Sequence, residues 1–260
     1  MKHICFILTL VLTSACWGFD KSDSQIIDSI FKESNKLYLA NHFENAVDGY
    51  LSIVDQNISN QILYYNIGNA YYRLDKLGYA RLYYEKAKNS AVSDNSLLDD
   101  ISYNISFLET QLIDEINPLP QFFLMKFMNK IILALSNNSW AFVLIIVMYV
   151  NLVLFLIFLF SSSSYVKSLT VKSLLFLFPF LLVVCFLFYM SSYQQQDVFA
   201  VLVSQNTYVK TAPSFNATNQ FIIHEGLKFE IIDVVDDWSR VLLSDGKDGW
   251  IENNHFVKIN

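Results

Sequence analysis

Two long apolar runs in the middle of the chain set its organisation. Residues 140–160 contain no charged side chain, and as a helix they would reach about 30 Å, the thickness of a bilayer's hydrocarbon core. Residues 174–193 are apolar as far as Met190 and end in polar residues that can lie among lipid headgroups. Residues 161–173 join the two runs. The pattern predicts a transmembrane hairpin, which returns the chain to the side that it left.

The first residues have the pattern of a secretory signal peptide. Lys2 precedes a short apolar run, and small residues follow around Ala15, so residues 1–18 are predicted to be the signal. A third membrane helix is the alternative, although the run is short for one. Cys16 directly follows Ala15, which leaves lipidation at this cysteine open.

The signal also decides the orientation. The hairpin loop carries two lysines and no acid, as cytoplasmic loops do, but Lys126 and Lys130 flank the first run on the other side, so the charge count is nearly even. A signal peptide places the segment after it outside the cytoplasm. We therefore predict a bacterial inner-membrane protein with both soluble parts in the periplasm.

Residues 20–116 repeat at a spacing of 34, the period of the tetratricopeptide repeat, a pair of antiparallel helices. The pattern predicts repeats at 27–60 and 61–94 and a capping helix at 95–116. Helix pairs of this kind form an α-solenoid with a groove. At this spacing, Leu37 aligns with Tyr71, Ala46 with Ala80, and Tyr50 with Tyr84.

The predicted groove is a candidate site for a protein or a peptide. Counting repeat positions, its lining would be Phe31, Asn35, Tyr38, Tyr65, Asn66, Asn69, Tyr72 and Arg73. The alternative is that the aromatic residues only complete the packing. Asn35 and Asn66 resemble the amides with which some such domains bind a terminal carboxylate, but Phe31 and Asp100 occupy positions that would need cations, which argues against carboxylate binding.

A linker and a short amphipathic helix are predicted at residues 117–136. Pro118 and Pro120 stop the preceding helix. The following residues put Lys126 and Lys130 outside an apolar face, as in a helix that lies in the membrane interface. That face consists of Phe122, Phe123, Phe127, Ile131 and Leu135.

Residues 197–260 change to the period-two pattern of short strands. Asp245–Gly246 between apolar runs indicates a hairpin turn. Several motifs here resemble those of bacterial SH3-like domains, which implies a small all-β barrel. The motifs are Val209-Lys210-Thr211-Ala212-Pro213-Ser214, His224-Glu225-Gly226, Trp238-Ser239-Arg240-Val241 and Asp245-Gly246-Lys247-Asp248-Gly249-Trp250-Ile251.

The order of all these segments resembles BatE-like proteins of the Bat (Bacteroides aerotolerance) group. That resemblance implies a cell-envelope complex for stress or oxygen tolerance, with membrane-anchored von Willebrand factor A-type proteins as partners. Related SH3-like domains bind cell-wall peptides, which makes peptidoglycan a further candidate partner. Carboxylates beside tryptophan could bind the amine of such a peptide. The candidate surface is Asp236, Asp237, Trp238, Asp248 and Trp250. The alternative is that both tryptophans only pack in the barrel.

Charge and composition exclude other functions. Residues 20–117 hold 8 basic and 15 acidic side chains and residues 197–260 hold 5 and 9, which argues against nucleic acid as a partner. After signal removal Cys185 lies in the second span, so no cysteine-based metal site is expected, and no cofactor motif or catalytic residue is found. Asn151 is predicted to bond between the two spans rather than to serve transport, since neither span holds an Asp, Glu, Lys, Arg or His.

Together these patterns predict a multi-domain membrane protein that is not an enzyme. It would be a scaffold that presents a tetratricopeptide groove and an SH3-like domain to the periplasm for protein–protein interaction. The alternative is an anchor or sensor that binds the cell wall through the SH3-like domain.

Overall fold

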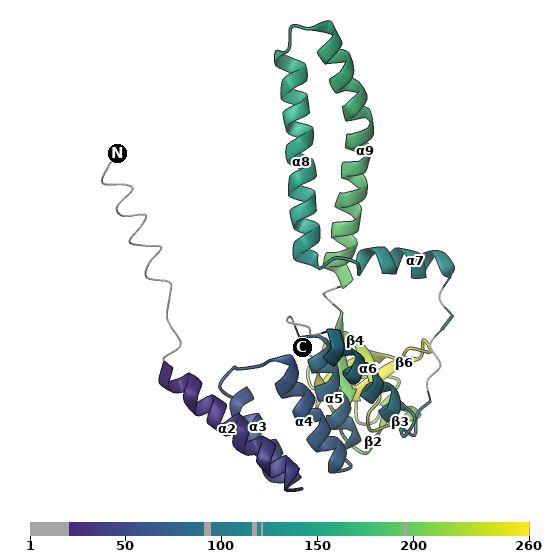
Figure 1. Cartoon of the computed structure of the whole chain (residues 1–260). Coiled ribbons are helices and arrows are strands. Elements are labelled where there is room, and N and C mark those ends of the chain that lie inside the picture. The colour runs from purple at the N-terminus through teal and green to yellow at the C-terminus, as the bar shows by residue number, and fades with distance from the viewer. Residues whose placement is uncertain (1–20, 91–94, 116–118, 121, 195–196, 260) are drawn as a thin grey trace, which may run out of the picture.

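The computed structural model describes residues 21–90, 95–115, 119–120, 122–194 and 197–259. The predicted signal peptide and Cys16 lie outside this range. Two long helices lie side by side and project from a body made of shorter helices and a β domain, and a short helix extends sideways from their base next to the second of them (Figure 1). The predicted mixture of helical pairs, a two-helix hairpin and a C-terminal β domain is therefore confirmed at this level.

Two antiparallel helix pairs and a fifth helix form the N-terminal part. They are α2 (Lys21–Leu39), α3 (Phe43–Val54), α4 (Gln61–Arg73), α5 (Leu77–Lys88) and α6 (Asn95–Glu109). The turns within the pairs contain Asn41 and Asp75, both with positive φ. Gly68 lets the helices of the second pair approach, because a Cβ there would lie 2.6 Å from the Tyr84 ring. Small and large residues therefore alternate in the shared core, as expected of close helix packing.

The fifth helix is shorter than the predicted span of 95–116. It ends at Glu109, and Thr110 and Gln111 form a turn whose N–H groups bond to carbonyls of its last turn. Beyond the turn, Leu112 packs against Gly226 and Asp114 bonds to His224, both in the β domain. The periodic pattern continues past Glu109 to Leu112, which is partly buried against the helical core and Gly226 without being part of a continuing helix.

Helices α8 (Asn137–Phe160) and α9 (Ser164–Gln194) are long and apolar enough to cross a membrane. The predicted loop 161–173 is therefore mostly helical, and only residues 161–163 lie between the helices. Asn151 bonds to Val147 of its own helix and contacts the Leu177 carbonyl of α9 at 3.5 Å. The predicted bond between the spans is present, although it is long.

The short helix at the base of the hairpin is α7 (Phe123–Ile132). The Trp140 indole N–H donates to the Ile132 carbonyl at 3.0 Å, which ties α7 to α8. Phe122, Phe123, Phe127 and Leu135 are exposed, as predicted for a lipid-facing side. Ile131 differs, because it packs against the protein in a cluster with Trp140 and Leu187.

The β domain is one antiparallel sheet with the strand order β3-β2-β6-β5-β4-β1-β7. Its hydrogen-bond ladder has two edges, β3 and β7, so the predicted barrel is an open, strongly curved sheet around one core. The core includes Val209, Phe229, Val241 and Ile251, all almost completely buried. The strands are β1 (Val198–Leu202), β2 (Asn206–Lys210), β3 (Asn219–His224), β4 (Lys228–Val235), β5 (Trp238–Leu242), β6 (Asp248–Glu252) and β7 (Phe256–Lys258).

The helical pairs and the β domain share a core. Leu82 of α5 packs with Val201 and Ile259 of the β domain, and all three are nearly inaccessible to solvent. No side chain fits at Gly78, since a Cβ there would lie 2.6 Å from the Leu202 carbonyl oxygen. The backbones of α5 and β1 therefore touch directly.

Candidate binding groove

A hollow of about 320 Å³ opens between α2, α3 and α4, which we call the amide hollow. Its lining residues are Asn35, Tyr38, Leu39, Tyr50, Asn66 and Asn69. Four of the eight residues predicted for the groove thus come together here. Leu39 and Tyr50 also line the hollow but were not predicted to do so. The match of Tyr50 with Tyr84 at the repeat spacing predicts a packing role for Tyr50, and it does not predict that Tyr50 also lines a hollow.

The amides are positioned by buried tyrosines. The Tyr50 hydroxyl donates to Asn35 Oδ1 at 2.6 Å, and the Asn66 amide donates to the same oxygen at 3.2 Å. One repeat later, the Tyr84 hydroxyl donates to Asn69 Oδ1 at 2.8 Å. Because buried polar groups need partners, each tyrosine fixes the rotamer of an asparagine that faces the hollow.

The amide hollow is uncharged. Loss of contact with water raises the pKa of Tyr50 to about 12, so its phenol stays protonated at neutral pH. Among the described residues, the amide nitrogen of Asn35 and the hydroxyl of Tyr38 have no hydrogen-bond partner. Neutral donors and acceptors suit a peptide backbone better than an ion, because desolvating an ion without an opposite charge is costly.

The other predicted groove residues lie around this hollow. Tyr65 accepts a hydrogen bond from Asn104 at 3.3 Å, and Tyr72 bonds with Gln111. Arg73 lies over the Phe43 ring, 4.5 Å from its centroid, so its charge does not enter the hollow.

Phe31 lies elsewhere. It lines a separate, mostly apolar hollow of about 280 Å³ with Ile53 and Leu63, and its ring packs against that of Tyr50. The structure therefore does not join Phe31 and Arg73 to the four residues that line the amide hollow.

The candidate surface on the β domain is dispersed. Trp238 is only 6% exposed and packs edge-to-face on Phe215. Asp248 forms an ion pair with Arg240 at 2.6 Å, which neutralises its charge. Asp236 and Asp237 are exposed at the β4–β5 turn, and Trp250 is half-buried. For Trp238 the arrangement favours packing over ligand binding.

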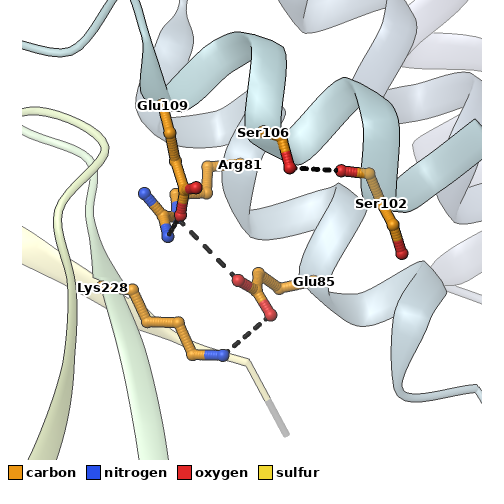
Figure 2. A network of polar contacts seen from close by, with 6 residues as sticks. All are labelled: Arg81, Glu85, Ser102, Ser106, Glu109 and Lys228. Carbon is orange, nitrogen blue, oxygen red and sulfur yellow. Dashed lines mark hydrogen bonds and ion pairs between the residues drawn. The ribbon is translucent and has the colours of Figure 1, made fainter. Parts of the chain in front are cut away.

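A network of four charged residues joins the two domains (Figure 2). Arg81 donates to Glu109 of α6 at 2.5 Å, while Lys228 of β4 pairs with Glu85 of α5 at 2.8 Å. Arg81 and Glu85 are both more than nine-tenths buried, and the Arg81 Nε lies 3.9 Å from Glu85. The opposite charges are balanced inside the contact. No sequence motif predicts this network, since its members come from three distant segments.

Two further contacts hold the domains in one arrangement. The Glu225 carboxylate accepts a hydrogen bond from the Gly78 N–H at 2.8 Å, at the beginning of α5. Asp114 accepts from the backbone N–H of His224 at 2.6 Å and also contacts its ring. His224 and Glu225 thus have structural partners. None of these residues lines the amide hollow, which remains open on the other helices.

No protein-family model matches the chain, and no curated protein is a significant match to it. The features of the structure that bear on function are the amide hollow, the β domain and the apolar hairpin.

Proposed function

We propose that the protein is a membrane-anchored scaffold whose amide hollow binds an extended segment of a partner protein. The observation that supports this most is the set of neutral amide and phenol groups held in fixed rotamers around an open hollow. Such groups can donate to and accept from a peptide backbone without needing a charged ligand. In this proposal the helical pairs are tetratricopeptide repeats, and the protein is not an enzyme.

The arrangement of the domains supports the same proposal. The β domain packs on α5, so the amide hollow on α2, α3 and α4 stays accessible. In the proposal the β domain is an SH3-like module that braces the repeats, and both face the periplasm above the inner membrane. Membrane-anchored von Willebrand factor A-type proteins of a Bat-type complex are the partners that we propose.

The test places a photo-crosslinking amino acid at Tyr38, in the amide hollow, in the full chain in its native membranes. A matched position is Tyr208, an exposed tyrosine of the β domain. We expect discrete protein adducts from position 38 that are lost when Asn66→Ala is added, since Asn66 faces the hollow. Equal adducts from both positions would contradict the proposal, and wall fragments bound at position 208 would favour the cell-wall anchor.

A further inference from the structure

A tyrosine lies at mid-depth on the lipid-facing side of the hairpin. Tyr149 is 12 residues after Asn137 and 11 before Phe160, the two ends of α8, and is therefore about 17 Å from either end. Its side chain is 67% exposed. If α8 crosses the membrane, this hydroxyl lies near the middle of the hydrocarbon core, and a tyrosine side chain is much too short to reach the headgroups.

The tyrosine points away from the partner helix. Trp140 and Asn151 are the buried residues of α8, and successive helical residues are about 100° apart. Tyr149 therefore lies about 160° from Asn151, on the side opposite α9. Within the described chain its hydroxyl has no hydrogen-bond partner. A hydroxyl without a partner is costly in hydrocarbon, and membrane proteins satisfy such groups between helices.

The same side of α8 has the spacing of a helix-packing surface. Exposed apolar residues lie above and below Tyr149 on this side, every three or four positions, so they can pack along a neighbouring helix once Tyr149 sets which side docks. These residues and Tyr149 form what we call the outer stripe: Phe142, Ile145, Tyr149, Leu152 and Leu156.

We propose that the outer stripe docks against the outer stripe of a second copy of this chain. Copies inserted in the same orientation have parallel α8 helices, so a twofold axis along the membrane normal places both Tyr149 residues at one depth. A phenol is donor and acceptor at once, so the two hydroxyls satisfy each other. The outer stripe contains no charged residue, so two copies do not repel each other there. The second copy itself supplies the hydrogen-bond partner that Tyr149 needs. The inference rests on membrane insertion of the hairpin and is independent of the amide hollow.

The first test measures self-association of the full chain in phosphatidylethanolamine–phosphatidylglycerol vesicles by fluorescence energy transfer between two labelled populations. We expect Tyr149→Phe to weaken association by about 3- to 17-fold, the range measured for hydrogen bonds between membrane helices. Tyr189→Phe is the matched control, because Tyr189 is similarly exposed but lies near the end of the hydrophobic span. No self-association, or equal association of the Tyr149→Phe chain and the wild type, would overturn the proposal.

The second test maps the contact face in native membranes. Single cysteines are introduced along α8 in a chain whose native cysteines are serine, and disulfide formation is followed. We expect crosslinked dimers from positions 142, 145 and 152, and none from positions 144 and 147, which are partly covered by the rest of the hairpin. Dimers from the latter positions, or adducts only with another protein, would refute docking of a second copy.

Discussion

Single side chains in the two helix pairs show how the lining of the amide hollow arises from packing residues. The Tyr50–Asn35 and Tyr84–Asn69 hydrogen bonds are the same interaction, one repeat apart. In each, a buried tyrosine uses the asparagine oxygen and so fixes the orientation of its amide nitrogen. Asn69 Oδ1 also accepts a hydrogen bond from the Asn104 amide, as Asn35 Oδ1 does from the Asn66 amide. Both asparagines line the amide hollow, Asn35 from α2 and Asn69 from α4.

Glu85 has a different role, since it is a buried acid that compensates two cations from different domains. We predict that Glu85→Ala lowers the free energy of unfolding by about 3–5 kcal/mol, because it leaves Lys228 unpaired and Arg81 buried with only Glu109 as its partner. Denaturant unfolding of the full chain in detergent, followed by tryptophan fluorescence, measures the change.

The control for Glu85 is an exposed pair of similar geometry. Asp28 and Lys32 form an ion pair at 2.6 Å within α2, with both side chains more than half exposed. Asp28→Ala should cost less than about 1 kcal/mol, since solvent screens such pairs. Equal effects of the two substitutions would show that the network between the domains contributes nothing beyond a surface ion pair.

At the scale of elements, the sequence predicts most helices and strands because their patterns are local. Apolar residues every three or four positions indicate the buried side of a helix, and apolar residues at every second position indicate the buried side of a strand. This holds whichever part of the chain covers that side. The ends are less predictable. The end of α6 at Glu109 coincides with contacts that the following residues make with Gly226 and His224 of the β domain. No window of the sequence around residue 112 contains that information.

The short helix α7 allows a direct test of the membrane interface. Phe127 is 59% exposed on a side that faces no protein, and Lys126, the residue before it, is also exposed. We expect a nitroxide at position 127 to lie below the phosphate level in bilayers and a nitroxide at the exposed Lys126 position, about 100° round the helix, to lie at or above it, because lysines reach toward lipid phosphates. Power-saturation EPR with oxygen and a water-soluble nickel complex measures both depths. Equal access of the nickel complex to the two labels would refute an interfacial helix.

At the scale of the molecule, the contact between the helical pairs and the β domain was not predictable. Gly78 and Glu225 are 147 residues apart, and neither belongs to a periodic pattern that would single it out. The amide hollow was half predictable, because the repeat spacing places Asn35, Asn66 and Asn69 on the inner helices. Which of the flanking residues join them, such as Tyr50 rather than Phe31, depends on how the two pairs stack.

The shape of the whole molecule makes its orientation in the membrane testable at one point. The helical pairs and the β domain lie beyond one end of the hairpin, the end at which α7 also lies (Figure 1). Only residues 161–163 separate α8 from α9 on the other side, and Lys167 and Lys172 follow in the first turns of α9. We predict that these lysines face the cytoplasm. Green fluorescent protein inserted after Ser162 should fluoresce and alkaline phosphatase inserted there should be inactive, whereas phosphatase fused after the β domain should be active. Phosphatase activity at position 162 would place both soluble domains in the cytoplasm, and a partner of the amide hollow would then have to be sought there.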